Sequence, residues 1–312
     1  MKKGTVLFRT MLGLSLAGIV LLASCSQSLV LPAYSFTTPE QYRTMKPVAG
    51  LTIEGAGSDG AFVDDRTVTL SAFQIASYQT TYELWYEVKA WGEQHGFVFS
   101  NDGRVGKEGT EGLTPGDDKL QPVTFITWRD LIVWCNAYSA MSNLTPAYYK
   151  DAAYTKQVTW LSNDNVFMKL DADGYRMPTV AEWECAARGG DPTNATWGYL
   201  YSGGDTLDDV AWSTTNSDNT THEVGLKEAN TAGLYDMSGN VWEYCFDWYS
   251  ATEDTGSFFN PIGISSSSGG LKTLCGGQFN NKEKECRTTG RKSFSSGNGA
   301  YGHGFRVVTS IL

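Results

Sequence analysis

The apolar and polar positions along the chain follow two periods, one typical of strands and one typical of helices. Residues 68–78 alternate between apolar and polar side chains, which predicts a β-strand. Residues 80–94 place apolar side chains on one face at helical spacing, so we expect a helix there with Thr81 as its N-cap. A polar stretch rich in glycine over residues 96–119 then predicts a long loop.

Two more helices and several short strands follow. Thr127 precedes helical spacing that reaches Tyr138, and Thr179 opens a shorter helix over residues 181–187. Short apolar runs predict strands over residues 122–125, 158–161, 175–177 and 304–309.

The remainder of the chain shows little periodicity. After Asp191 almost no segment has helical spacing, and Gly, Asn, Ser, Thr and Asp dominate the sequence. No repeat and no long linker interrupts residues 50–312. We therefore expect one α+β domain over residues 48–312, loop-rich and with little regular structure in its C-terminal half.

The N-terminus has the features of an exported chain. Two lysines precede an apolar run over residues 6–22, and small residues then lead to Cys25. This pattern predicts a signal peptide over residues 1–24 and a polar tether over residues 25–47. Residues 22–25 (Leu-Ala-Ser-Cys) resemble the lipobox of bacterial lipoproteins, which implies cleavage before Cys25 and acylation of its thiol. The alternative is an ordinary signal peptide with a chance cysteine.

Charge and histidine content narrow the classes of partner. The chain carries 24 Lys and Arg against 34 Asp and Glu, a net charge of −10, whereas nucleic acid needs a basic surface. The three histidines lie far apart in sequence, so a metal centre built from several histidines is not expected. We expect a membrane-anchored, extracytoplasmic lipoprotein on the outer surface of a bacterial cell, monomeric and without a nucleic-acid partner.

The cysteines do not form an obvious framework. Of six cysteines, five remain when the lipobox cysteine is set aside, and an odd number cannot pair fully. No Cys-x-x-Cys pair occurs, so a structural zinc site is not expected. Cys135, Cys185 and Cys245 stand in apolar surroundings and are expected to be buried thiols, whereas Cys275 and Cys286 lie in a segment rich in Gly and Asn.

Common catalytic motifs are missing from the sequence. It contains no Ser/His/Asp set, phosphate-binding loop or dinucleotide fingerprint. Glu184 and Arg188 are four residues apart on the third predicted helix, which indicates an ion pair better than a catalytic pair.

Several long motifs occur in a characteristic order. They are residues 122–138, residues 175–188 (YRMPTVAEWECAAR), residues 230–243 (NTAGLYDMSGNVWE), Gly276-Gly277, Cys286-Arg287 and residues 304–308 (GFRVV). Together they resemble the formylglycine-generating-enzyme-like domain of sulfatase-modifying factors, which has a fold related to C-type lectins. The resemblance extends from about Phe73 to Val308.

The resemblance implies an oxidase in some members of the family. Those members convert a sulfatase cysteine to formylglycine with two cysteines separated by four residues, which hold copper; soft thiolates suit Cu(I). Cys286 matches the second of these cysteines, but Asn281 stands at the first position. We therefore expect no catalysis and no copper, and a packed, inert Cys286. A copper oxidase acting on a protein cysteine is kept as an alternative.

Other members resembling this chain are the variable proteins of diversity-generating retroelements, such as the treponemal variable protein, itself a lipoprotein. In them a C-terminal lectin-like segment is rewritten by adenine-directed mutagenesis. The corresponding segment here is residues 275–303, and side chains of its types can give adaptable contacts on a rigid scaffold. The candidate ligand-binding residues are Cys275, Gln278, Asn280, Asn281, Gly290, Phe294, Asn298, Tyr301 and His303.

The sequence does not identify the ligand. We expect a protein or a glycan, carried by another cell or a host. A fixed-specificity envelope binding protein without diversification is the alternative, and a further alternative is that the Gly, Asn and Ser residues of this segment simply form turns.

A candidate cation site lies in the third motif. The resemblance implies a structural calcium ion bound by the side chains of Asp236 and Glu243 and the carbonyls of Gly239 and Val241. Hard oxygen ligands from a tight turn fit calcium. The alternative is a structural turn in which the two carboxylates accept backbone N–H groups.

Overall fold

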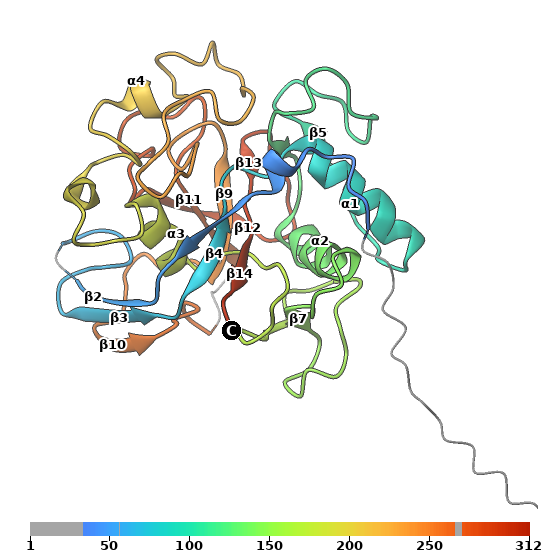
Figure 1. Cartoon of the computed structure of the whole chain (residues 1–312), viewed down its shortest axis with the longest axis horizontal. Coiled ribbons are helices and arrows are strands. Elements are labelled where there is room, and N and C mark those ends of the chain that lie inside the picture. The colour runs from blue at the N-terminus through green and yellow to red at the C-terminus, as the bar shows by residue number, and fades with distance from the viewer. Residues whose placement is uncertain (1–33, 56, 266–269) are drawn as a thin grey trace, which may run out of the picture. The chain divides into compact units, whose positions relative to one another are not determined.

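The computed structural model describes residues 34–55, 57–265 and 270–312 (Figure 1). The predicted signal peptide over residues 1–24 and the predicted lipidation site, Cys25, lie outside these ranges. Within them, no helix is long and apolar enough to cross a bilayer. Three small sheets, two two-stranded ladders and a few short helices are joined by long loops, which confirms the α+β, loop-rich class.

One central strand joins two ends of the packed chain. β4 (Phe73–Ala76) lies between β1 (Met45–Val48) and β14 (Val308–Ser310), and both pairings are antiparallel. β1 falls largely within the stretch predicted as a polar tether up to residue 47. The packed part of the chain therefore begins earlier than the sequence indicated.

The residues before β1 are also packed. The 3-10 helix η1 (Glu40–Arg43) precedes β1, and Thr38 is only 1% exposed. The backbone N–H and the hydroxyl of Thr38 donate to Glu87 Oε2 at 2.9 and 2.6 Å. The polar composition of this stretch suggested a tether. It could not reveal that the carboxylate of Glu87, far away in sequence, satisfies the N–H and the hydroxyl of Thr38.

The strand predicted over residues 68–78 is divided between two sheets. Its first part is β3 (Arg66–Leu70), which lies between β10 (Gly256–Phe259) and β2 (Leu51–Glu54), and its second part is β4. The break falls at Ser71, whose N–H donates to the side chain of Asn260 at 2.8 Å. Apolar and polar side chains alternate without interruption across Ser71, so the sequence pattern could not show that the strand ends there.

A four-stranded sheet underlies the C-terminal segment. Its order is β12 (Arg291–Ser295), β11 (Leu271–Cys275), β9 (Trp242–Trp248) and β13 (His303–Gly304). The strands β9, β10, β11 and β12 were not predicted from the sequence. Six of the seven residues of β9 are buried, so both of its faces are covered and the strand lacks the alternation of a half-exposed one.

The other short strands only partly match their predictions. β6 (Val123–Thr124) pairs with β5 (Arg104–Val105), and β7 (Tyr148–Tyr149) pairs with β8 (Phe167–Met168). Residues 158–161 form no strand, and residues 175–177 contribute only a single bridge from Arg176 to Val308.

The three predicted helices begin at the predicted threonines. They are α1 (Tyr82–Gln94), α2 (Trp128–Met141) and α3 (Val180–Ala187), with N-caps Thr81, Thr127 and Thr179. Each threonine hydroxyl accepts a backbone N–H three residues later, which satisfies one of the free donors at a helix start. The single-turn helix α4 (Leu207–Val210) and the 3-10 helix η2 (Ala195–Gly198) were not predicted.

The core is built largely from aromatic side chains. Trp85 of α1 and Trp134 of α2 stack with ring centroids 5.9 Å apart, and Phe305 meets both rings edge-on. α3 covers the other side of the four-stranded sheet, where Trp183 is fully buried. Because truncation of such a tryptophan costs about 3–5 kcal/mol, these side chains hold the scaffold beneath the C-terminal loops.

Candidate functional site

The segment predicted to bind ligand, residues 275–303, runs from the end of β11 through a loop to β12 and then to β13. The chain turns sharply after β11 because Gly276 and Gly277 have φ values of +92° and +80°. A Cβ at Gly277 would lie 2.8 Å from the sulfur of Cys286. Both glycines are therefore required by the backbone and by close packing, and they fix where the next loop starts.

Six of the nine predicted ligand-binding residues reach solvent at least in part. They are Gln278, Asn280, Asn281, Phe294, Asn298 and Tyr301. The other three, Cys275, Gly290 and His303, are buried, and their assignment to the ligand face was wrong.

The three buried residues have structural surroundings. Cys275 is 1% exposed and lies in the core under α3. Gly290 sits where any Cβ would collide with the carbonyl of Glu285. His303 packs edge-on against Phe294 at a centroid distance of 4.2 Å, and burial holds the pKa of its imidazole well below the usual value. The imidazole is therefore neutral near pH 7.

The exposed residues form two neighbouring loops. A side chain at Gly302 would collide with the amide of Gln278, so the loops that carry Gln278 and Tyr301 are in contact. Gln278 Nε2 donates to Asn280 Oδ1 at 2.6 Å. Tyr301, 47% exposed, lies against Phe125 at a centroid distance of 5.2 Å. We call the exposed residues Asn280, Asn298 and Tyr301, together with the half-buried Gln278, the C-terminal face.

A positive charge supports the aromatic part of this face. The guanidinium carbon of Arg104 lies 4.2 Å from the ring centroid of Phe125 and 5.1 Å from that of Tyr301. Such contacts contribute about 0.5–1 kcal/mol at exposed sites. They hold Tyr301 in place as a rigid contact residue, a property useful for binding because little rotamer freedom remains to be lost.

A groove of about 830 Å³ borders the first of these loops. Lys282, Glu283 and Lys284 form one wall, and the opposite side is formed by Leu200, Tyr201 and residues 205–208 and 213–215. The backbone N–H of Thr214 donates to the carbonyl of Asn281 at 3.0 Å, which joins the two walls. The groove residues between 200 and 215 were not predicted, because only folding brings them next to the C-terminal segment.

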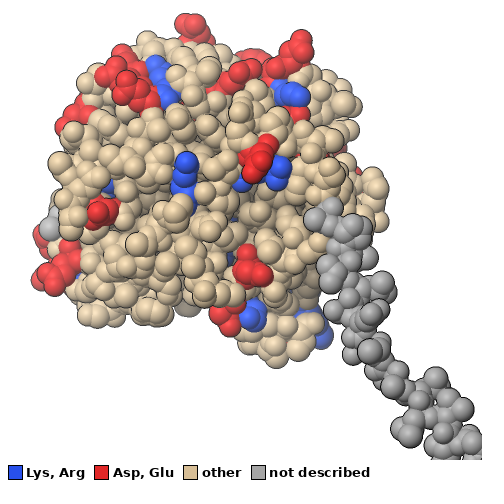
Figure 2. Space-filling model, viewed as in Figure 1, with Lys and Arg blue, Asp and Glu red and all other residues tan. Residues whose placement is uncertain are grey.

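The walls of the groove carry mixed charge. Asp205, Asp208 and Glu283 stand with Lys282 and Lys284, and the hydroxyls of residues 213–215 lie between them. The face of the molecule in Figure 2 likewise shows acidic side chains in separate groups, with basic ones singly among them. This surface suits a neutral or mixed polar ligand better than a polyanion.

Cys286 lies beneath the groove and is fully buried. It packs with Tyr201, Leu207, Val210 and Ala211, and burial raises the pKa of its thiol to about 12. At the position of the missing partner, Asn281 Oδ1 accepts the N–H of Gln278 at 3.0 Å. The site thus holds one protonated thiol and an amide that completes a turn, as the sequence indicated for Cys286.

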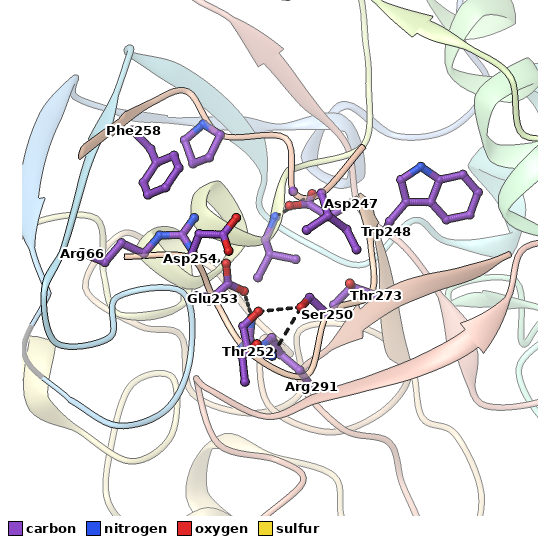
Figure 3. A pocket seen from close by; sticks show the side chains of 14 residues that line it. Arg66, Asp247, Trp248, Ser250, Thr252, Glu253, Asp254, Phe258, Thr273 and Arg291 are labelled. Carbon is purple, nitrogen blue, oxygen red and sulfur yellow. Dashed lines mark hydrogen bonds and ion pairs between the residues drawn. The ribbon is translucent and has the colours of Figure 1, made fainter. Parts of the chain in front are cut away.

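A second, smaller pocket of about 50 Å³ lies between β3, β12 and the loop after β9 (Figure 3). Glu253 pairs with both Arg66 and Arg291, which reach it from two strands. Asp247 accepts the N–H of Val180 at 3.0 Å, and burial raises the pKa of its carboxyl to about 7. Because Glu253 neutralises one nitrogen of each guanidinium group, this pocket is first of all a structural clamp between two strands.

Oxygens of all four predicted calcium residues surround the side-chain amide of Gln79, although Asp236 does so with a different atom than predicted. Gln79 Nε2 lies 3.0 Å from the carbonyls of Asp236 and Val241, 3.4 Å from that of Gly239 and 3.0 Å from Glu243 Oε1. Asp236 thus contributes its carbonyl, whereas its carboxylate Oδ2 accepts the N–H of Gly225 at 2.7 Å. We call these four oxygens around Gln79 the oxygen cluster.

The oxygen cluster has more acceptors than protons. An amide NH₂ carries two protons, so it can satisfy two of the four oxygens. Gln79 Oε1 and Asp236 Oδ1 are also buried and have no hydrogen-bond partner within the described ranges. Burial raises the pKa of Asp236 to about 6. Carbonyl and carboxylate oxygens are ligands that suit a hard cation such as calcium. Within residues 34–55, 57–265 and 270–312, however, no three His, Cys, Asp or Glu side chains lie close enough together to bind a metal ion.

A buried ion pair borders the oxygen cluster. Arg306 donates from Nε to Glu243 Oε2 at 2.7 Å and from Nη2 to Oε1 at 2.8 Å. Trp183 Nε1 also donates to Glu243 Oε2 at 2.7 Å. Neither Gln79 nor Arg306 was singled out from the sequence, because Gln79 is 157 residues away from Asp236 and Arg306 lies within an apolar strand-like motif.

Comparison with known proteins defines the class. Residues 33–311 match the sulfatase-modifying factor enzyme 1-like domain, so the chain belongs to this family. The resemblance inferred from the motifs is thereby confirmed.

The names of individual relatives differ: one is an enzyme, one a chaperone protein and one a variable protein. The formylglycine-generating enzyme of Thermomonospora curvata is 30% identical over 318 residues, which cover 90% of this chain and 100% of the relative. The chaperone protein LppX of Paenibacillus barcinonensis is 36% identical over 210 residues, 61% of this chain and 67% of that protein. The structure of Treponema denticola variable protein 1 matches with a TM-score of 0.68 and 29% identity, covering 86% of this chain and 95% of the other.

Proposed function

We propose that this protein is a lipid-anchored, non-catalytic binding protein that contacts its ligand through the C-terminal face and the adjoining groove. The observation that carries the proposal is the arrangement of exposed Asn280 and Tyr301, with the half-buried Gln278 between them, on loops fixed by glycines and a buried sheet. Residues on such loops can change without loss of the core. Anchoring through Cys25 places the face in the extracytoplasmic space, on the outer surface of the cell.

The absence of catalysis is part of the proposal. Two thiolates are needed for a copper site of the oxidase type, and Asn281 stands where one of them is required. The remaining thiol, Cys286, is buried, and its raised pKa disfavours the thiolate.

Diversification of the face is the finer part of the proposal. It is supported by the similarity to Treponema denticola variable protein 1. The alternative of a fixed-specificity envelope protein is favoured by the 36% identity to the chaperone protein LppX. In that case the groove beside Lys282 is the site of a constant polypeptide partner.

A structural calcium ion is the third part of the proposal. The carbonyls of Asp236, Gly239 and Val241 and the carboxylate of Glu243 would hold it. A bound cation would bring together the three carbonyls, which have no charged partner of their own, and would fix the loop between residues 236 and 243 beneath the C-terminal face.

Deep sequencing of the 3′ end of the gene across a population tests diversification. We expect changes at adenine positions of a neighbouring template copy, in codons for the exposed Asn280 and Tyr301 and not in those for the buried Cys275 and His303. An invariant 3′ end without a template copy would leave the fixed-specificity protein.

Binding is tested with the mature chain on a printed glycan array and an immobilised peptide array. Tyr301→Ala is expected to weaken binding about tenfold or more, since rigid aromatic contacts dominate interfaces. Tyr154→Ala is the matched control, because Tyr154 is 40% exposed but lies outside the C-terminal face. Equal binding by both variants would refute the assignment of the face, and copper-dependent oxidation of a cysteine peptide would favour the enzyme.

A further inference from the structure

Two of the buried cysteines lie side by side. Cys245 is in β9 and Cys275 ends β11, and these strands pair antiparallel. Cys275 stands opposite Glu243, so Cys245 is its diagonal neighbour on the same face of the sheet. Their sulfur atoms are 3.7 Å apart.

The other cysteines are separate. Cys135 lies on α2, Cys185 lies on α3, and Cys286 lies under the groove. Within residues 34–55, 57–265 and 270–312, Cys245 and Cys275 are the one pair of cysteines with sulfurs in contact. The five cysteines of the described residues thus comprise one neighbouring pair and three cysteines that lie apart from each other.

We propose that Cys245 and Cys275 form an intrachain disulfide in the mature, exported protein. This inference rests on export, which belongs to the proposed function, because disulfides persist in oxidising compartments. The two thiols lose two protons and two electrons as the sulfur–sulfur bond forms. A disulfide oxidant, such as an oxidoreductase of the envelope or oxidised glutathione, accepts the electrons and leaves as two thiols.

The geometry requires only a small adjustment. A disulfide joins sulfurs about 2.05 Å apart, so the sulfurs must approach by about 1.7 Å. The register of β11 against β9 shifts between Lys272 and Leu274, and Gly276 follows Cys275 in a left-handed conformation. An irregular strand next to a glycine turn can adjust more readily than a regular ladder.

Burial decides when the bond forms. Both cysteines lie in the core under α3, and burial raises the pKa of the Cys245 thiol well above its usual value. The thiolate is the reactive species, so the packed pair reacts slowly. Oxidation therefore precedes the docking of α3 on the sheet, and the finished bond is protected from reductants.

The bond supports the proposed ligand site. β11 leads directly through Gly276 and Gly277 into the loop that carries Gln278 and Asn280. β9 carries Glu243 of the oxygen cluster. A covalent link between these strands fixes the base of the C-terminal face independently of the residues that line it.

Thiol counting after refolding tests the inference without relying on export. The mature chain is unfolded, reduced and refolded in a buffer of oxidised and reduced glutathione. It is then denatured, alkylated and weighed. We expect three alkylated cysteines besides Cys25, and after digestion a peptide linking Cys245 to Cys275. Five alkylated cysteines besides Cys25 would overturn the proposal.

Variants identify the partners. Cys245→Ala is expected to free Cys275, so the count besides Cys25 rises from three to four. Cys185→Ala, a change in the same buried cluster, is expected to keep the link and lower the count to two. A Cys245→Ala count of two would mean that another pair had formed, and would also overturn the assignment. Membrane fractionation of a Cys25→Ala variant tests the anchor separately, so the two proposals can fail independently.

Discussion

Replacement of Arg306 by methionine removes the cation at the centre of the fold and keeps most of the side-chain length. Arg306 is 0% exposed and binds both carboxylate oxygens of Glu243. It also donates to the carbonyl of Tyr235 at 2.7 Å and to that of Ala76 at 3.0 Å. Methionine offers none of these donors.

The magnitude follows from burial. Loss of one partner from a buried ion pair costs about 3–5 kcal/mol, because the remaining charge stays in the interior without compensation. Glu243 keeps hydrogen bonds from Trp183 and Gln79, which limits the loss. The two carbonyls lose donors as well. We therefore expect a loss of about 4 kcal/mol in the free energy of unfolding.

Urea unfolding followed by tryptophan fluorescence measures this loss. Arg129→Met is the matched control, because Arg129 pairs with Asp164 at 2.7 Å but is 31% exposed. Such a partly buried pair, with its arginine reaching solvent, is expected to contribute clearly less than the fully buried one. We attribute the importance of Arg306 to its burial. If Arg306→Met and Arg129→Met lowered the free energy of unfolding equally, this explanation would be refuted. Arg306→Met combined with Glu243→Met is expected to recover part of the stability, because no charge is then left buried.

Three further predictions concern the sites. If the oxygen cluster holds calcium, EDTA lowers the melting temperature, and Glu243→Gln, which removes the one carboxylate of the cluster, largely removes the difference; equal melting with EDTA and with calcium would contradict the site. Cys286→Ala is expected to cost only about 1 kcal/mol, and a Cu(I) competition assay should show no two-thiolate copper binding in either form; tight binding lost in the variant would support the oxidase. In EDTA, Asp247 should add stability as the pH falls from about 7 toward 5: its folded-state pKa is raised to about 7, so below that pH the folded carboxyl holds a proton that the unfolded one releases, with a slope of up to about 1.4 kcal/mol per pH unit. The lowered pKa of His303 acts in the opposite direction, so the contribution of Asp247 is measured as a difference between the native chain and a variant. Asp247→Asn should reduce this slope in urea titrations, and an unchanged slope would argue against a buried, protonated Asp247.

The features that sequence analysis predicted well are set by neighbouring residues. Each main helix starts at the predicted threonine, because a cap needs only its own side chain and a backbone N–H three residues later. The Glu184–Arg188 ion pair is likewise local, with a nitrogen–oxygen distance of 2.9 Å on α3. The family motifs were also recognisable, because they are long, ordered and rich in aromatic residues.

The features that were missed depend on contacts between distant parts of the chain. Cys275 and His303 stand among Gly, Asn and Ser residues typical of loops, but β9 and its neighbours cover them, and exposure cannot be known before the strands are placed. The same reason hides Gln79, which meets the oxygen cluster only after folding. The groove wall over residues 205–215 was missed as well, since nothing in its own sequence points to Lys282.

The position of β14 next to β4 has a consequence for the timing of folding in the cell. Val308 pairs with Ile75, and Arg306 completes the polar centre with Glu243. Neither contact can form on a ribosome until nearly the entire chain has been synthesised. Contacts over such sequence distances also form slowly. The nascent chain thus remains without its finished central sheet until synthesis is nearly complete, and under the proposed export this delay would leave the chain unfolded for transport.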